Sequence, residues 1–445
     1  MSQPLPTENT PFDLVGVGFG PSNLAMAIAV AEHNGHTDAV APAGRQPGVS
    51  ARFLERQPAF GWHRGMLIDD ATMQVSFLKD LVTLRNPGSA FTFLRYLHER
   101  GRLVDFINHK TLFPLRVEFH DYFAWAAAQV DALVSYDTEV LSVQPVRDGD
   151  GTIGALDVLS RRGDSMATHR ARNLVLGTGL RPRMPAALAR SERIWHNSDL
   201  LHQVDRLRGT APRRFVVVGA GQSAAETAAY LHREFPTAEV CAVFSRYGYS
   251  PADDSAFANR IFDPAAVEDY YHAPESTKRR LMEYHGNTNY SVVDIDLIDA
   301  LYRTEYREKV LGQRRLRLLN VTALASAAES AAGVDVDVTS LITGEHRTLH
   351  ADALVCATGY EAADPLAVLG PVAELCARDA HGRPQVTRDY RAVTAPELRC
   401  GIYLQGGTEH SHGITSSLLS NTAVRVGEML ASMLTRRAAP ALAPA

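Results

Sequence analysis

The chain has 445 residues, of which 45% are hydrophobic and 21% charged, so we expect a soluble globular protein with about two or three domains. Its net charge of −5, without a basic stripe, argues against a nucleic-acid partner, because such a partner needs positive charge against its phosphates. No run of residues is long and apolar enough to span a bilayer.

Cysteine usage and the N-terminus indicate the compartment. The first residues have neither the basic region nor the apolar core of a signal peptide. No Cys/His spacing typical of zinc is present, and His410 and His412 lack an obvious third ligand, so we predict no bound metal. The four cysteines form no CxxC pair, which suits a reducing cytoplasm and excludes a thioredoxin-reductase-type dithiol; they are Cys241, Cys356, Cys376 and Cys400.

A dinucleotide-binding motif lies near the start of the chain. An apolar strand over 12–17 leads into a turn with Gly18, Gly20 and Asn23, and an Ala-rich helix begins at about Ser22. This is the GxGxxG spacing with Asn in the third position. The first glycine permits a tight turn, the second lets the backbone approach a pyrophosphate, and the helix N-terminus supplies N–H donors. The strand–turn–helix context favours a nucleotide site over an ordinary glycine-rich turn.

An acidic residue completes this unit. The fingerprint predicts an acid at the end of the following strand, where it binds the adenosine ribose, and the strand over 52–56 supplies Glu55. The gap between the helix and this strand is longer than usual, and residues 42–49 are interpreted as an inserted loop.

A lysine follows the unit directly. Met73, Val75 and Phe77 alternate with polar residues, which predicts a half-buried strand, and Lys79 lies just beyond it. A lone lysine is usually solvated, so this pattern alone leaves a surface position and a functional role equally open. Residues 133–178 then predict strands and turns that end in Gly-Thr-Gly, where the chain returns to the nucleotide domain before a proline-containing linker.

The opening pattern recurs in the middle of the chain. Residues 214–230 predict a strand, a turn with Gly219, Gly221 and Ala224, and a helix. The next strand ends without an acid that could bind a ribose diol, and Arg246 follows it. An arginine at that point favours a 2′-phosphate, hence NADPH over NADH, although an exposed loop residue is an equally good interpretation.

Two nucleotide units in one chain indicate one site for FAD and one for NADPH, as in flavoprotein reductases and monooxygenases. We therefore predict an α/β fold with two Rossmann-like dinucleotide-binding domains and a smaller inserted substrate-binding domain. The predicted segments are the FAD domain at 1–185, the NADPH domain at 186–249, the substrate-binding insertion at 250–310, the rest of the NADPH domain at 311–398, the return to the FAD domain at 399–434 and a disordered tail at 435–445.

These motifs together resemble a known family. The chain is similar to the N-hydroxylating flavin monooxygenases of siderophore biosynthesis, the L-ornithine N5- and L-lysine N6-monooxygenases, and within them to actinobacterial ornithine hydroxylases. The resemblance spans about 12–430. The stretches that carry it are 17–24, 73–80, 218–226, 257–264, 287–293, 357–360 and 412–420.

The resemblance implies positions for the cofactors and the substrate. FAD contacts are expected at Gly18, Gly20, Pro21, Ser22, Asn23, Glu55, Trp62, His63, Gln74, Val140, Ser417, Leu418 and Leu419. NADPH contacts are expected at Gly219, Ala220, Gly221, Gln222, Ser223, Asn289, Tyr290 and Ser291, with Arg246 added from its place after the strand. Substrate contacts are expected at Lys79, Asn259, Arg260, Ile261, Phe262, Asn289 and Ser420.

The resemblance also implies a reaction. NADPH reduces FAD, the reduced flavin takes up O₂ as a C4a-hydroperoxide, and the neutral side-chain amine attacks the distal oxygen. The chemistry is flavin-centred, so no catalytic side chain is predicted. Family members suggest a homotetramer.

Other interpretations remain open. Within the family, L-ornithine is favoured over L-lysine or a diamine such as putrescine. Lys79 suits a substrate with a carboxylate, which counts against the diamine, whereas the chain length of the substrate is not readable from one sequence. A flavin-dependent disulfide or quinone reductase is a more distant alternative, against which the missing CxxC and the long insertion count. A non-enzymatic FAD-binding redox sensor is the third, and two intact fingerprints argue against it.

Overall fold

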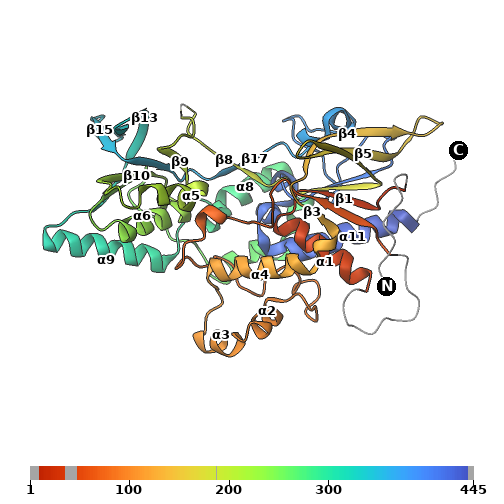
Figure 1. Ribbon diagram of the computed structural model, residues 1–445, viewed down its shortest axis with the longest axis horizontal. Helices are drawn as coiled ribbons and strands as arrows, with labels where there is room; N and C mark the ends of the chain where they lie inside the picture. Colours follow the sequence, from red (N-terminus) through yellow and green to blue (C-terminus); the bar gives the residue numbers. More distant parts are fainter. Residues whose placement is uncertain (1–9, 36–47, 187, 439–445) are drawn as a thin grey trace.

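The computed structural model describes residues 10–35, 48–186 and 188–438. Two lobes lie side by side along the long axis of the molecule, and each is built around a five-stranded parallel sheet (Figure 1). The predicted α/β class with two Rossmann-like units is confirmed. No helix among the described residues is long and apolar enough to cross a membrane.

The first unit has the strand order β18–β7–β1–β2–β3. Its strands alternate strictly between two cores: Leu14 packs with helices on one face, whereas Val15 packs with the antiparallel sheet on the other. The parallel strands are β1 (Leu14–Val17), β2 (Ala51–Leu54), β3 (Val134–Ser135), β7 (Asn173–Leu176) and β18 (Gly401–Leu404). The antiparallel sheet consists of β4 (Glu139–Arg147), β5 (Ile153–Arg162) and β6 (Ser165–Ala171).

The second unit repeats this plan with the order β12–β11–β10–β16–β9. In both units the strand before the glycine turn is central, and an antiparallel sheet lies in sequence just before a strand that pairs with this central strand. The parallel strands are β9 (Ile194–His196), β10 (Arg214–Val218), β11 (Glu239–Val243), β12 (Leu316–Leu319) and β16 (Ala353–Cys356). The antiparallel strands are β13 (Thr322–Ser330), β14 (Gly333–Ser340) and β15 (His346–Ala351).

Helices cover the sheets and bridge the units. The insertion contributes to both cores, because α7 packs Val267 into the first and α9 packs Leu301 into the second. The helices are α1 (Pro21–His33), α2 (Phe93–Glu99), α3 (Leu103–His109), α4 (Arg116–Gln129), α5 (Leu200–Val204), α6 (Gln222–Glu234), α7 (Pro264–His272), α8 (Glu275–His285), α9 (Ile295–Leu311), α10 (Glu409–His412) and α11 (Thr422–Ala438).

Two of the crossings between the units run along paired strands. β8 (Leu180–Pro182) and β17 (Tyr360–Ala362) run antiparallel between the lobes (Figure 1). Each follows a Thr-Gly pair at the end of a buried strand, and the glycines Gly179 and Gly359 both have positive φ. Nη2 of Arg183 donates to the carbonyl oxygen of Thr358 at 2.8 Å. The two crossings therefore form one hydrogen-bonded ribbon.

Three sequence predictions need correction. The predicted strand at Met73–Phe77 is absent: the segment consists of turns, with one isolated bridge between Thr72 and Leu115. Its partner contains Pro114, which accepts from the backbone N–H of Met73 but has no N–H to donate, so no ladder continues. The apolar alternation reflects packing into the first core.

The boundary of the second unit was also wrong. Residues 366–398 were predicted to belong to the NADPH domain, but Leu366, Leu369 and Leu398 pack with Val15 in the first unit. They cover the face of the first sheet that its helices leave open. At the C-terminus, α11 continues through Ala438, so the start of the predicted tail is helical. Residues 439–445, and most of the predicted loop at 42–49, lie outside the described residues.

Candidate active site

The first glycine turn has the shape that a pyrophosphate needs. Gly18 has φ +81°, and a Cβ there would lie 2.5 Å from the carbonyl oxygen of Gly177 on the neighbouring strand. A Cβ on Gly20 would meet nothing within 4 Å, so the space before the N-terminus of α1 is open. Pro21 occupies the first turn of α1, where no intrahelical N–H bond is lost. These features fit a dinucleotide.

Asn23 and Glu55 both hold this turn. The side-chain amide of Asn23 donates to the carbonyl oxygens of Gly18 at 2.7 Å and Val17 at 3.2 Å, which fixes the turn from inside. One carboxylate oxygen of the buried Glu55 accepts from the backbone N–H of Phe19 at 2.6 Å. Glu55 stands at the end of β2 as predicted, and it has acceptor capacity left for a ribose hydroxyl.

The second glycine turn has the same construction. Gly219 has φ +142°, and a Cβ there would lie 2.3 Å from the carbonyl oxygen of Ala357. Gly221 caps α6, and a Cβ on it would lie 3.4 Å from Cα of Ser291 in the insertion. Arg246 lies after β11, exposed, and its Nη1 donates to the carbonyl oxygen of Ser291 at 2.8 Å. The structure thus brings together the predicted NADPH segments.

The predicted substrate segments also meet. The 3-10 helix η5 (Ala258–Phe262) contacts η8 (Ile414–Ser417), which leads into η9 (Leu419–Asn421) and hence Ser420. Nζ of the half-buried Lys79 lies 5.7 Å from the ring centre of Phe262. Burial lowers the pKa of Lys79, and the nearby Asp263 opposes this shift. Among the described residues Lys79 makes no ion pair closer than 4 Å, so its charge is available to an anion.

Asp80 holds the turn that presents Lys79. Its Oδ1 accepts from the backbone N–H groups of Val82 at 2.9 Å and Thr83 at 2.6 Å. Its Oδ2 accepts from the backbone N–H of Phe93 at 2.8 Å, so the turn is tied to α2. Burial raises the pKa of Asp80, while these hydrogen bonds lower it. Sequence reasoning missed this role, because a partner 13 residues away leaves no local pattern.

A carboxyl group that the sequence did not single out faces the insertion. Oη of Tyr290 donates to Oε2 of Glu409 at 2.9 Å, which links a predicted NADPH contact to α10 of the first unit. Burial raises the pKa of Glu409, and the bond from Tyr290 lowers it. The contact joins loops that belong to different units.

A polar chain connects the two nucleotide units. Gln74, a predicted FAD contact, lies 3.4 Å from Asp294, whose backbone N–H donates to the side chain of Gln222 at 2.8 Å. Gln222 then donates to Glu226 on α6 at 3.0 Å. Glu226 is paired with Arg116 at the start of α4, at 2.6 and 2.9 Å. Predicted contacts of the two cofactors are thereby linked through groups that the sequence did not identify.

The ion pair at this junction is buried. The side chains of Arg116 and Glu226 are only 12% and 5% exposed, and both terminal nitrogens of Arg116 contact the carboxylate. Arg116 also donates to the carbonyl oxygen of Met66 at 3.0 Å. Such a pair is costly to break, because one partner alone would be a buried, uncompensated charge.

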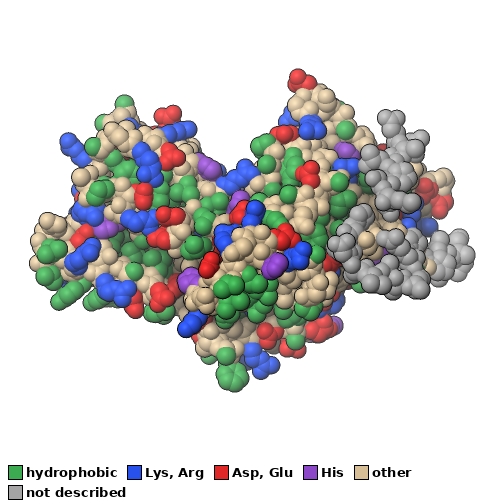
Figure 2. All heavy atoms as spheres, turned by 60° about the horizontal axis from the view of Figure 1, so that its bottom comes forward, with side chains coloured by type: hydrophobic (Ala, Val, Ile, Leu, Met, Phe, Trp, Pro, Cys, Tyr) green, Lys and Arg blue, Asp and Glu red, His purple; other side chains and the backbone are tan. Residues whose placement is uncertain are grey.

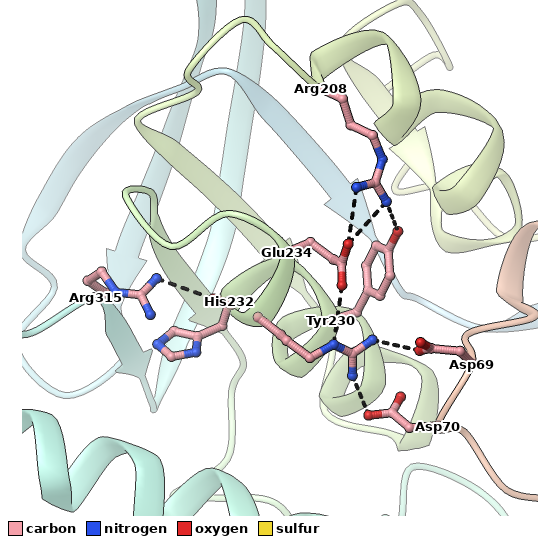
Figure 3. Close-up of polar contacts among 8 residues, drawn as sticks. Asp69, Asp70, Arg208, Tyr230, His232, Glu234 and Arg315 are labelled. Carbon is pink, nitrogen blue, oxygen red and sulfur yellow. Dashed lines mark hydrogen bonds and ion pairs between the residues drawn. The ribbon is translucent and has the colours of Figure 1, made fainter.

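An exposed set of ion pairs lies at the other end of α6. Figure 3 shows Asp69 and Asp70, from the loop before α2, beside the end of this helix. Nη2 of Arg233 contacts Asp69 at 2.8 Å, and Nη1 contacts Asp70. The carboxylates are largely exposed, so we assign these pairs little energy.

Of the remaining predicted FAD residues, His63 lies at the joint between the units. His63 has φ 50° and lies beside Tyr360 of β17, with ring centres 6.1 Å apart. Burial lowers the pKa of His63 to about 4, with Arg116 contributing, so this imidazole is neutral at pH 7. Trp62 packs on Phe123 of α4. Val140 lies on β4, in the first unit.

The two histidines of α10 make contacts within the protein. His410 lies 2.8 Å from the carbonyl oxygen of Pro384, and His412 stacks on Tyr390 with ring centres 4.0 Å apart. Burial lowers the pKa of His412 to about 3. The described residues contain no group of three or more His, Cys, Asp or Glu side chains that could hold a metal ion. The four cysteines are free and buried.

Figure 2 shows the molecule hollowed between its two lobes. Both glycine turns follow the carboxyl ends of central strands, where open α/β sheets bind their ligands. One arrangement therefore contains two nucleotide cradles, by which we mean the two glycine turns with the helix N-termini that follow them. It also contains Lys79, which has no ion-pair partner within the described residues, and the polar loops of the insertion. This arrangement suits transfer of reducing equivalents between two cofactors.

Comparisons with known proteins agree. A family model described as L-lysine 6-monooxygenase/L-ornithine 5-monooxygenase matches residues 10–362. An L-ornithine N(5)-monooxygenase of Burkholderia cepacia is 45% identical, covering 91% of this chain and 90% of that protein. The solved ornithine N-hydroxylase of Kutzneria sp. 744 is 46% identical with a TM-score of 0.90, covering 96% of this chain and 100% of that one.

A lysine-specific relative is also similar. The solved L-lysine 6-monooxygenase of Pseudomonas syringae is 30% identical with a TM-score of 0.81, covering 96% of this chain and 99% of that one. The family predicted from the motifs is confirmed by these matches and by the fold. The chain belongs to the L-lysine 6-monooxygenase/L-ornithine 5-monooxygenase family of NADPH-dependent flavin N-monooxygenases.

Proposed function

We propose that this chain hydroxylates the side-chain amine of L-ornithine at N5, with FAD, NADPH and O₂, for siderophore or related natural-product biosynthesis. The observation that carries the proposal is the placement of Lys79 and η5 in a molecule with two complete nucleotide cradles. The Burkholderia relative is named for L-ornithine, and the Kutzneria enzyme was solved with reduced FAD, NADP⁺ and L-ornithine.

Each unit has a distinct task in this proposal. The first turn and Glu55 hold FAD, which when bound supplies the oxygen chemistry. The second turn, Arg246 and residues 289–291 hold NADPH, with the guanidinium directed to the 2′-phosphate. The remaining predicted contacts, from Trp62 and His63 to Ser417–Leu419, line the flavin side.

The substrate amine must be neutral to attack, so the chain's task is to bind and orient it and to exclude water. Lys79 offers its cation to the α-carboxylate, and the side chain of Asn259 keeps an oxygen free after donating to the carbonyl oxygen of Asp254 at 2.6 Å. Asn289 and Ser420 are proposed to complete the pocket. The pH dependence of turnover is then expected to report deprotonation of the substrate amine.

Lysine and diamines are the competing substrates. The Pseudomonas syringae relative is a lysine enzyme, and a solved relative from Erwinia amylovora that is 25% identical is a cadaverine monooxygenase. Lys79 favours an amino acid over a diamine. The test is product analysis of the purified protein with ornithine, lysine and putrescine side by side, together with NADPH consumption. Preferential formation of N5-hydroxyornithine is expected, and NADPH oxidation without hydroxylamine from any amine would refute the proposal.

We also infer a homotetramer in the cytoplasm. Two separate apolar surfaces are exposed among the described residues, and a tetramer with dihedral symmetry uses two different interfaces. One surface, on α3 and after it, contains Val104, Ile107, Leu112 and Phe113; the other, along α9, contains Ile295, Tyr302, Tyr306 and Val310. Light scattering tests the tetramer: Tyr306→Glu should yield a smaller oligomer. Cell fractionation tests the location.

A further inference from the structure

Among the residues that the structure describes, one buried cation in the first unit has no ionic partner. Arg425 on α11 is only 2% exposed. Its Nε donates to the side-chain oxygen of Gln405 at 3.0 Å, and its Nη1 donates to the carbonyl oxygen of Ser416 at 2.6 Å. Its Nη2 donates to the hydroxyl oxygens of Ser22 at 3.3 Å and Thr422 at 3.2 Å. All these partners are neutral.

The nearest acidic group is already neutralised. Glu428, one turn further along α11, accepts two bonds from Arg388, at 2.9 and 3.1 Å. No described carboxylate lies within 4 Å of the Arg425 guanidinium, which instead lies 6.0 Å from the ring centre of Tyr390. Arginine remains charged when buried, so the ligand-free chain holds an uncompensated cation, which is unfavourable.

The partners of Arg425 belong to two segments of one site. Ser22 lies in the first turn of α1, directly after the glycine turn, and Gln405 donates to the carbonyl oxygen of Ser22 at 3.2 Å. Ser416 directly precedes residues 417–419. The guanidinium group of Arg425 therefore joins Ser22, at the end of the first glycine turn, to Ser416, at the start of the loop on the proposed flavin side.

We propose that Arg425 is a positioning residue for FAD, whose buried charge is compensated by the pyrophosphate when the cofactor binds at the first glycine turn. This rests on the proposed FAD site. Because the Ser22 hydroxyl oxygen accepts from Arg425, its own proton is directed to another acceptor. The arginine adds its field to that of the α1 N-terminus, and both favour an anion at this point.

The proposal predicts opposite effects on the apoprotein and the holoprotein. Arg425→Met and Arg425→Gln remove the positive charge, whereas Arg425→Lys keeps the charge but not the planar set of N–H donors. In both neutral variants the apoprotein should melt at or above the wild-type temperature, because an unfavourable buried charge is gone. FAD affinity should fall about 10- to 100-fold, and the rise in melting temperature on adding FAD should shrink accordingly. Arg425→Lys should stay within about threefold of the wild-type affinity.

The assay is titration of deflavinated protein with FAD, followed by flavin fluorescence, with melting curves of each form. Arg391→Met is the control, because Arg391 is partly buried, makes no ion pair within the described residues and donates to the carbonyl oxygen of Cys400 at 3.0 Å. Its FAD affinity should be unchanged. ADP, which carries the pyrophosphate without the flavin, should lose affinity by a factor similar to that for FAD in the neutral Arg425 variants.

Several results would overturn the inference. Unchanged FAD affinity in both neutral variants would do so, as would equal losses in Arg391→Met. If Arg425→Met does not fold, comparing the FAD affinity of Arg425→Gln with that of Arg425→Lys still tests the effect of the positive charge. If all three variants lose affinity and apoprotein stability together, Arg425 is only structural. A wild-type protein that binds no FAD refutes the proposed function itself, which is a separate outcome.

Discussion

Replacing Lys79 by Ala tests the substrate assignment directly. The side chain is half-buried, its nearest aromatic neighbour is Phe262, and it makes no ion pair within the described residues. Removing it leaves a bound carboxylate without a charge-assisted contact, which costs roughly 1.5–3 kcal/mol. Because solvent reaches part of Lys79 and screens its charge, we expect the lower part of this range, about 1.5–2 kcal/mol, or roughly a 10- to 30-fold rise in KM for ornithine.

The assay measures KM, the ratio of hydroxylated product to NADPH consumed, and the rate of flavin reduction. Flavin content and reduction should survive in Lys79→Ala, since Lys79 belongs to neither nucleotide cradle, and uncoupled formation of H₂O₂ should increase. Lys79→Met keeps the aliphatic stem without the charge and should show the same rise in KM. Putrescine, which has no carboxylate, should be affected much less.

Lys278 provides the matched control. Its Nζ also lies over an aromatic ring, 5.8 Å from the centre of Tyr270, and it is paired with Glu275 at 3.7 Å. Lys278→Ala should leave KM for ornithine unchanged. An unchanged KM in Lys79→Ala would refute the carboxylate assignment, and a collapse of flavin reduction would move Lys79 to the nucleotide sites.

The other predictions concern the cradles and their junction. Gly18→Ala places a methyl group 2.5 Å from a backbone oxygen at a positive φ, so the purified protein should lose its flavin; stoichiometric FAD would contradict the first site. Arg246→Ala should narrow the preference for NADPH over NADH in flavin reduction, and an unchanged preference would place the 2′-phosphate elsewhere. Glu226→Gln leaves Arg116 buried and unpaired, which should cost about 3 kcal/mol of unfolding free energy in denaturant titrations; a loss below about 1 kcal/mol would show that water reaches the pair. Burial raises the pKa of Glu409 in the folded protein, so the contribution of Glu409 to stability is present below its unfolded pKa and is lost as pH rises through the folded value. The melting temperature of Glu409→Gln should therefore rise relative to that of the wild type as pH increases across this window. A constant difference in melting temperature would contradict this.

Local patterns located the cradles because each depends on a short run of sequence. Gly18 and Gly219 are required by a turn whose opposing backbone atoms come from Gly177 and Ala357, each directly after a strand that the sequence also indicated. Lys79 was located only through family motifs, since its neighbours Phe262 and Asp263 are far away in the chain.

The groups that the sequence did not identify act over long separations. Arg116 and Glu226 are 110 residues apart, and Tyr290 and Glu409 are 119 apart. No periodicity or spacing encodes such a pair, because the sequence around each residue carries no sign of its partner. The boundary error has the same origin: residues 366–398 carry an apolar pattern that fits either sheet, and only the three-dimensional packing shows which sheet they cover.

The paired strands β8 and β17 also constrain how the two lobes can move. The backbone runs between the lobes at these two adjacent strands, and it also reaches across near Met66, which packs in the second core, and within the insertion, whose α7 packs Val267 into the first. A two-stranded ribbon resists stretching through its hydrogen bonds but bends and twists readily. A rotation of the second lobe about this ribbon would therefore also have to strain the links at Met66 and Val267. The Arg116–Glu226 pair adds a further buried link, because it joins α4 of the first unit to α6 of the second.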